Sequence, residues 1–360
     1  MVHPGPVSEH PHQARETPRA LGYSAVAEWE RNAACFSAWP AHAYAWGEYL
    51  AQAQREFTAF CLALCADHGA ERLELLVPDA TGEAEARAAL APVAERVRFH
   101  RMACGDVWLR DTAPLFVRGP RGLAAVRFAF NGWGSKYEYP GDAELGARLS
   151  QMCGLPAFAF DAVLEGGALE LDGQGTCLTT ESCLLNDNRG RGLTRARIEA
   201  ALREALAVER VLWLREGLAG DHTDGHIDNL VRFVAPGVVV HMRASGAGDP
   251  NGATLEAIER DLAGMRDARG RVLSRIAIPS PGRVVDRAGA PMAASYMNFY
   301  LGNRSVIVPG FDSEHDEPAR RALARVFPDR RVVTCTARAI LEGGGGTFHC
   351  MTRQQPEALP

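Results

Sequence analysis

Along this chain, short runs of β-branched and aromatic residues alternate with longer segments in which apolar residues recur at helical spacing. The short runs are typical of strands and cover Arg72–Val77, Val97–Met102, Ala125–Phe130, Leu230–Val234, Val238–Met242, Val306–Val308 and Val332–Thr336. The longer segments predict helices and cover Trp46–Cys65, Glu83–Val93, Thr194–Ala207, Thr254–Met265 and Glu317–Val326. The alternation predicts a fold of the α/β class, built from small αβ modules.

The mixed pattern runs through the chain without a break in composition, so we expect one domain and no linker. The first 20 residues differ, because they are rich in proline, histidine and charge. Such composition is typical of a loose terminal segment. Apolar and aromatic residues become dense near Trp29, where we expect ordered structure to start. We therefore assign residues 1–25 to a flexible leader and residues 26–360 to a single domain.

Composition narrows the class of protein. Hydrophobic residues make up 47% of the chain and charged residues 23%, a balance typical of a globular domain with a large core. The net charge of −5 argues against nucleic-acid binding and favours a cationic small substrate. Nine cysteines without a CxxC pair indicate a reducing compartment. With no apolar signal segment and no run long enough to cross a membrane, we expect a cytoplasmic protein.

Cys350 is the first candidate for chemistry, in the segment GGGGTFHCMTRQQP. Most cysteines are buried structural residues. A thiol in a glycine-rich loop can instead face a substrate, and a nearby cation can hold it as the nucleophilic thiolate. His349 is adjacent, but neighbouring side chains of an extended chain point in opposite directions. We therefore do not expect His349 to be the base that serves Cys350.

A second candidate cluster is the segment GDHTDGHIDNLVRF, which contains His226 and Asp228. Histidine and aspartate both bind divalent metals, but no HExxH pattern and no complementary Cys/His cluster accompanies them. If the following strand already begins at His226, the two side chains lie on one face. That arrangement suits a proton-transferring imidazole beside a carboxylate that binds a cation. Loop caps and a surface histidine are the alternative interpretation.

Further carboxylates occur beside turn residues, at Asp106 and Asp111 in GDVWLRDTAP and at Glu165 in LEGG. Any one of them alone is best explained as a turn cap or an ion pair. Several carboxylates around one pocket would repel one another unless a cation joined them. A guanidinium group fits, because it is planar, permanently charged and offers five N–H donors. No P-loop, dinucleotide-binding GxGxxG or GxSxG motif is present to suggest other chemistry.

Taken together and in order, these segments resemble the agmatine deiminase family, which is grouped with bacterial peptidyl-arginine deiminases. The matching blocks are FSAWPAHAYAW, GDVWLRDTAPLFV, FNGWGSKYEYP, LEGGALELDGQGTCLTTESCLLNDNRG, GDHTDGHIDNLVRFV, ASYMNFYLGN and GGGGTFHCMTRQQP. They extend over nearly the whole chain. The resemblance implies the pentein fold, a five-bladed pseudo-symmetric α/β propeller with a central active site, and catalysis without a metal or organic cofactor.

The resemblance also implies a role for each matching residue. Cys350 corresponds to the nucleophile, His226 to the general acid/base, and Glu165 to a catalytic carboxylate that binds the guanidinium. Asp111 and Asp228 correspond to the aspartates that hold the guanidinium, with Asp106 as a weaker alternative to Asp111. Within the matching blocks we also expect Trp108 and Asn298 to contact substrate. Three departures from the family pattern lie close to these blocks and bear on the substrate tail: Ala113, Thr347 and Gly190.

The implied reaction begins with attack of Cys350 on the central guanidinium carbon, after which His226 protonates the departing ammonia. Water then opens the thiouronium adduct. For agmatine the products are N-carbamoylputrescine and ammonia. One alternative is a deiminase of another guanidine, such as peptidyl-arginine, arginine or a specialised metabolite. A second is a non-catalytic guanidine-binding protein, although binding alone needs neither thiol nor imidazole. Because family members commonly assemble, we expect a homodimer.

Overall fold

The computed structural model describes residues 16–358. The first 15 residues of the expected leader lie outside this range. Within it, strand β1 (Ser24–Ala25) pairs antiparallel with β5 (Leu115–Gly119), and the Tyr23 side chain is buried. The density of apolar residues indicated that ordered structure starts near Trp29. Regular structure in fact begins a few residues earlier.

The strands of the described chain form five separate sheets. The first combines β1 and β5 with β6 (Gly122–Ala129) and β7 (Ala157–Val163). The second sheet is made of β8 (Glu170–Leu171), β9 (Thr176–Thr180) and β10 (Arg210–Leu214). The third is made of β11 (Val231–Ala235), β12 (Val238–Arg243) and β13 (Ser274–Pro279). The fourth is made of β14 (Tyr300–Leu301), β15 (Ser305–Gly310) and β16 (Arg331–Thr336). The fifth has the order β17 (Arg353–Pro356), β2 (Asn32–Ala38), β3 (Arg72–Val77), β4 (Val97–Arg101).

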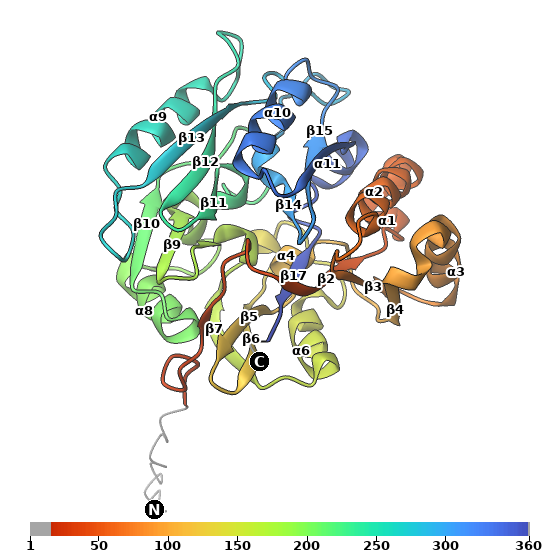
Figure 1. The fold of residues 1–360 in the computed structure, drawn as a ribbon, viewed down its shortest axis with the longest axis horizontal. Coiled ribbons are helices and arrows are strands. Elements are labelled where there is room, and N and C mark those ends of the chain that lie inside the picture. Colours follow the sequence, from red (N-terminus) through yellow and green to blue (C-terminus); the bar gives the residue numbers. More distant parts are fainter. Residues whose placement is uncertain (1–15, 359–360) are drawn as a thin grey trace, which may run out of the picture.

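Each sheet repeats one unit: an antiparallel pair of strands, a helix, and a strand parallel to the second of the pair. Parallel neighbours require a crossover, and a helix supplies it. The crossover helices are α6 (Asp142–Cys153), α8 (Arg195–Leu206), α9 (Gly252–Ala263), α10 (Asp316–Val326) and α2 (Leu50–Cys65). Figure 1 shows these helices toward the periphery of the molecule. Five such units are consistent with the expected five-bladed propeller.

The fifth unit is closed by segments from opposite ends of the described chain. Strand β17 pairs antiparallel with β2, and β2 in turn pairs parallel with β3. The helix α3 (Ala80–Ala89) adds a further parallel strand, β4, to this sheet. Because Cys350 lies just before β17, the pairing of β17 with β2 holds the segment that contains Cys350 against the N-terminal part of the described chain.

Short helical turns between the larger elements make up the rest of the regular structure. They are α1 (Ala43–Trp46), η1 (Gly47–Tyr49), η2 (Ala91–Arg96), α4 (Leu109–Thr112), α5 (Gly132–Ser135), η3 (Gly166–Ala168), α7 (Glu181–Leu184), η4 (Ile227–Asn229), η5 (Tyr296–Asn298) and α11 (Arg338–Gly344). None of these short turns was expected as a separate element. The tetraglycine segment was expected between elements, yet Gly343 and Gly344 belong to the last turn of α11.

The predicted elements agree with the structure in type, and differ in some boundaries. The strand Arg72–Val77 is found as predicted, whereas helix α3 begins at Ala80 rather than at Glu83. The reason is Asp79, whose side chain accepts hydrogen bonds from the backbone N–H groups of Thr81 and Gly82 and so caps the helix. The predicted helix Trp46–Cys65 is interrupted by η1.

Apolar side chains from the sheets and helices fill the core. On α9, Leu255, Ile258 and Leu262 recur on one face and are buried. Burial of each such side chain stabilises the fold by about 1.5–3 kcal/mol. Nine free cysteines lie within the described chain, and none forms a disulfide. No helix in residues 16–358 is long and apolar enough to cross a membrane.

Candidate active site

The sequence-predicted site residues lie at equivalent places in the repeated units. Asp111 is on α4, just before β5, and Glu165 directly precedes η3, just before β8. The turn η4, preceded by His226, leads into β11, and η5 leads into β14. The segment containing Cys350 leads into β17. Each unit thus contributes, at its entrance, one member of a single set: Asp111, Glu165, His226 with Asp228, Asn298 and Cys350.

Cys350 lines a cavity while being 4% exposed. Its Sγ accepts a hydrogen bond from Asn298 Nδ2 at 3.0 Å and lies 3.6 Å from Asp228 Oδ2. Burial raises the pKa of the thiol well above its ordinary value, and the charges of Asp228 and Asp111 raise it further. The raised pKa favours the protonated thiol over the thiolate. Asn298 contacts the sulfur, and its expected contact with substrate stays a prediction.

Asp228 is fully buried, and His349 contacts its carboxylate. His349 Nδ1 lies 2.7 Å from Asp228 Oδ2, and His349 Nε2 lies 2.9 Å from Glu28 Oε1. Burial raises the pKa of Asp228, but the hydrogen bond and charge of His349 outweigh it and lower the pKa below its usual range. Asp228 is thus an ionised carboxylate. The other oxygen, Oδ1, has no hydrogen-bond partner within the described chain.

His226 lies among carboxylates. Its Nδ1 is 3.8 Å from Asp111 Oδ1, and neither ring nitrogen has a hydrogen-bond partner among the described residues. Burial lowers the pKa of the imidazole, but the charges of Asp111, Glu165 and Asp228 outweigh it, so the net pKa is raised. These neighbours favour an imidazolium, the form that can donate a proton to a leaving group.

Glu165 is fully buried, and burial raises its pKa above the usual range. Its Oε1 accepts a hydrogen bond from Arg189 Nε at 2.8 Å, and its Oε2 has no hydrogen-bond partner within residues 16–358. Arg189 also donates to Thr223 O at 2.9 Å and pairs with Asp224. The guanidinium of Arg189 therefore fixes one oxygen of Glu165 and leaves the other available to a ligand.

Asp111 and Asp106 play different structural parts. Asp111 accepts hydrogen bonds from Gly167 N at 2.8 Å and Trp133 Nε1 at 2.9 Å, beside His226. Both oxygens of Asp106 are taken by backbone and indole donors: Val107 N, Trp46 Nε1 and Trp108 Nε1. Burial raises the pKa of Asp106 to about 6. Asp106 therefore orients the two tryptophans, and Asp111 is the carboxylate placed beside the imidazole.

Gly167 allows the site to be assembled. A Cβ atom at this position would lie 2.5 Å from His226 Nδ1 and 2.9 Å from Asp111 Oδ1, which no side chain can tolerate. Its N–H is the group that donates to Asp111. The Glu165-Gly-Gly motif is thus explained by close packing of backbone against two functional side chains.

The cavity above Cys350 has aromatic walls. Its lining includes Trp108, together with Trp133, Tyr137, Tyr139, His222 and the glycines 343–346. Beside His222, Lys136 Nζ pairs with Asp224 Oδ1 at 2.5 Å and donates to His222 O at 2.9 Å. An aromatic channel ending at carboxylates suits a slender cation with an apolar stem.

The condition for placing His226 and Asp228 on one face of a strand is not met. His226 precedes the turn η4, and β11 begins only at Val231. Asp228 lies within this 3-10 turn, directly after His226 and Ile227. The hydrogen bond from His226 N to Thr223 Oγ1, at 3.0 Å, secures this turn.

Several residues of the site were not identified from the sequence. Glu28 and Arg189 act through contacts with residues distant in the chain, so no local pattern marks them. His349 was recognised only as a neighbour of Cys350; its side chain contacts Asp228 and Glu28. Trp133 could have been identified from the sequence, since it stands between glycines in NGWG. In the structure it adopts a positive φ of 54°, which is uncommon for a residue other than glycine.

An α/β fold of five sheets, with a thiol and a carboxylate lining one cavity and an imidazole and further buried carboxylates next to them, defines a class of enzymes: hydrolases that act on C–N bonds of guanidines. The chain belongs to the Porphyromonas-type peptidyl-arginine deiminase family, whose profile matches residues 24–356. The expected family and the pentein fold are thereby confirmed.

Individual relatives agree with this assignment. The agmatine deiminase of Stutzerimonas stutzeri is 38% identical over 364 residues, covering 94% of this chain and 97% of that protein. The agmatine deiminase of Pseudomonas aeruginosa is 37% identical over 366 residues, with the same coverage. The solved structure of Enterococcus faecalis agmatine deiminase superposes with a TM-score of 0.88 at 29% identity, covering 96% of this chain and 98% of that one.

Proposed function

We propose that this protein hydrolyses agmatine to N-carbamoylputrescine and ammonia, with Cys350 as the nucleophile. The observation that carries the proposal is a chain of close contacts between buried carboxylates and two reactive side chains. Asp228 Oδ2 lies 3.6 Å from Cys350 Sγ, Asp111 Oδ1 lies 3.8 Å from His226 Nδ1, and Glu165 has an oxygen within 4.8 Å of a His226 ring nitrogen. Three buried carboxylates require a cation between them. A guanidinium meets this need, because its planar fork of N–H donors matches several carboxylates at once.

In the proposed reaction, the bound guanidinium places a positive charge beside the sulfur and favours loss of the Cys350 thiol proton. The thiolate attacks the central carbon, aided by the hydrogen bond from Asn298 Nδ2. His226, as imidazolium, gives its proton to the departing nitrogen, which leaves as ammonia. The neutral imidazole then takes a proton from water, and the hydroxide attacks the thiouronium carbon. The Cys350 thiolate leaves as the urea product forms.

The substrate tail follows from the cavity walls. No arginine or lysine is among the described residues that line the cavity. Arg110 pairs with Glu28 at 2.6 Å, and Arg353 donates to the carbonyl of Arg110, so both guanidinium groups have partners outside the lining. A site of this kind disfavours free arginine and accepts agmatine, which has no carboxylate.

The second candidate function is deimination of another guanidine, either peptidyl-arginine, arginine or a specialised metabolite. The description of the family names peptidyl-arginine, which makes it one of these alternative substrates. Ammonia release from agmatine, arginine and a blocked arginyl peptide tests both candidates under one set of conditions. We expect kcat/KM for agmatine to exceed that for arginine by about ten- to hundredfold, from about 1–3 kcal/mol of lost hydrogen bonding to the carboxylate. Equal values would overturn the assignment of agmatine.

The remaining features of the proposal concern the setting of the enzyme. We infer a cytoplasmic location from nine unpaired cysteines, a state typical of a reducing compartment. We also propose a homodimer, no nucleic-acid partner and no requirement for a metal or organic cofactor. Light scattering after size-exclusion chromatography tests the dimer.

A further inference from the structure

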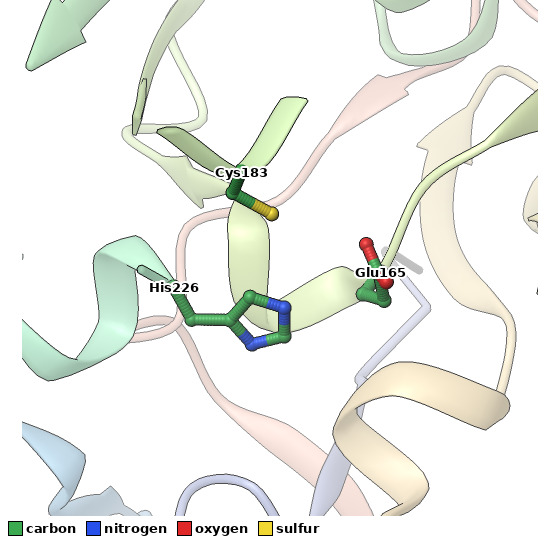
Figure 2. Close-up of side chains that lie close together, drawn as sticks. All are labelled: Glu165, Cys183 and His226. Carbon is green, nitrogen blue, oxygen red and sulfur yellow. The ribbon is translucent and has the colours of Figure 1, made fainter. Parts of the chain in front are cut away.

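Three side chains with metal-binding atoms meet beside the guanidine site. Glu165, Cys183 and His226 place a carboxylate oxygen, a sulfur and a ring nitrogen within 4.8 Å of one another, and all three residues are buried. Cys183 is on α7, so the three come from separate segments. Figure 2 shows the sulfur, the imidazole and the carboxylate turned toward a common space. The proposed reaction gives no task to Cys183.

A second observation points to a ligand at this place. Both ring nitrogens of His226 and Oε2 of Glu165 are buried without a hydrogen-bond partner in the described chain. An unsatisfied buried polar atom costs about 1–3 kcal/mol. One ring nitrogen of His226 and one carboxylate oxygen of Glu165 belong to the group of atoms that lie within 4.8 Å of one another. A guanidinium can satisfy the carboxylate oxygen, but it has no acceptor for an imidazolium N–H and no affinity for a thiol.

We propose that Glu165, Cys183 and His226 form an inhibitory binding site for Zn²⁺. Zn²⁺ prefers sulfur, nitrogen and carboxylate ligands in a tetrahedron, and three protein ligands leave the fourth position to water. On binding, the S–H bond of Cys183 and one N–H bond of the His226 imidazolium break, both protons pass to solvent, and the freed sulfur and nitrogen lone pairs bind the metal. Nothing is oxidised or reduced.

Charge and connectivity support the set of ligands. A thiolate and a carboxylate together neutralise Zn²⁺, which a buried site requires. Oε1 of Glu165 remains with Arg189 at 2.8 Å, so Oε2 is the oxygen that faces the metal. Cys183 itself makes no contact with Cys350 or Asp228, the pair 3.6 Å apart that could form a rival site.

The expected consequence is competition between metal and substrate. Under the proposed function, His226 transfers protons and Glu165 binds the guanidinium, so a metal on these residues excludes the substrate. The inhibitory effect rests on that proposed function, whereas metal binding by the three side chains does not. The two can therefore be tested separately.

The binding test uses the Cys350→Ser variant, which retains Cys183 as the thiol of the site. Titration with Co²⁺, a spectroscopic substitute for Zn²⁺, should give a thiolate-to-cobalt charge-transfer band in this variant. The double variant Cys350→Ser/Cys183→Ala should lose the band and bind Zn²⁺ at least about tenfold more weakly in competition with a chromophoric chelator. Cys350→Ser/Cys335→Ala is the matched control and should keep both. A band that persists without Cys183, or no band in Cys350→Ser, would overturn the proposal.

The inhibition test uses the active enzyme. Zn²⁺ should inhibit the wild type competitively against agmatine, and Cys183→Ala should keep its turnover while requiring at least about tenfold more Zn²⁺ for half inhibition. Cys183→Ser serves if the alanine variant does not fold, since thermal melting identifies that case. Equal sensitivity of folded Cys183 variants and wild type would refute the inhibitory site. Lack of agmatine turnover would instead refute the proposed function and leave the cobalt test valid.

Discussion

His349 Nδ1 lies 2.7 Å from Asp228 Oδ2, on the carboxylate oxygen that also faces the Cys350 thiol. On its other side, His349 Nε2 lies 2.9 Å from Glu28 Oε1. Burial and the charges of Arg110 and Arg232 lower the pKa of His349, whereas the charge of Glu28 and the hydrogen bond with Asp228 raise it. Glu28 therefore favours the protonated form of the ring, and contact with His349 lowers the pKa of Asp228.

We therefore predict that Glu28→Gln weakens substrate binding without removing a catalytic group. Loss of a charged hydrogen bond costs about 1.5–3 kcal/mol, which corresponds to about a ten- to hundredfold lower kcat/KM. Because His349 lowers the pKa of Asp228, weakening that support raises it, and the acid limb of the pH profile should move to higher pH. Glu30→Gln, on the same segment, is the control and should match the wild type. An unmoved acid limb would show that Glu28 has only a structural part.

The second prediction concerns the nucleophile. Cys350→Ser should abolish turnover while leaving the thermal melting temperature close to that of the wild type, because the hydroxyl fits where the thiol packs. Iodoacetamide should inactivate the wild type, with agmatine protecting. The other cysteines should be individually dispensable for turnover. Activity of the serine variant near the wild-type level is the result that would contradict the mechanism.

The third prediction separates Asp111 from Asp106. Asp111→Asn removes a charge beside the guanidinium, and kcat/KM should fall at least about thirtyfold, from a loss of about 2 kcal/mol or more. Asp106→Asn should mainly lower the melting temperature, since an amide cannot accept from Trp46, Trp108 and Val107 as the carboxylate does. The opposite pattern, with Asp106 controlling kcat/KM, would restore Asp106 as the residue that holds the guanidinium.

The fourth prediction follows the charge on His226. Burial lowers its pKa, and Asp111, Glu165 and Asp228 raise it above the usual value. Removing the first of these charges should therefore lower the pKa, so that the imidazole becomes neutral at a lower pH. NMR titration of His226 in Cys350→Ser, with and without Asp111→Asn, measures the shift directly. A pKa that stays constant or rises would mean that Asp111 does not act on the imidazole.

A fifth prediction is that exhaustive chelation leaves activity unchanged, because the proposed chemistry uses only protein side chains. If Zn²⁺ contaminates a preparation, chelation should increase the rate. A loss of activity that is restored by adding one metal would place the enzyme among the metallohydrolases.

The sequence allowed the α/β class and the main functional residues to be predicted, for physical reasons that are visible residue by residue. Strand Arg72–Val77 combines apolar residues and burial, whereas β7 alternates between exposed and half-buried positions and was missed. Cys350, His226 and Glu165 could be proposed as site residues because their chemistry is distinctive and their blocks match a family, and their roles stay predictions. Glu28 was not found, because its partners Arg110, Arg232 and His349 are 82, 204 and 321 residues away.

The pairing of β17 with β2 has a consequence for when this enzyme becomes active. We expect Cys350 to reach its neighbours only after β17, near the end of the described chain, has paired with β2, near its start, and so has completed the fifth unit. During synthesis the earlier units are made first and can fold before that junction forms. We therefore expect a partly folded chain to carry the carboxylates and the imidazole without the thiol in place, and to be catalytically inactive. A variant that loosens this junction should lose turnover before it loses most of its secondary structure.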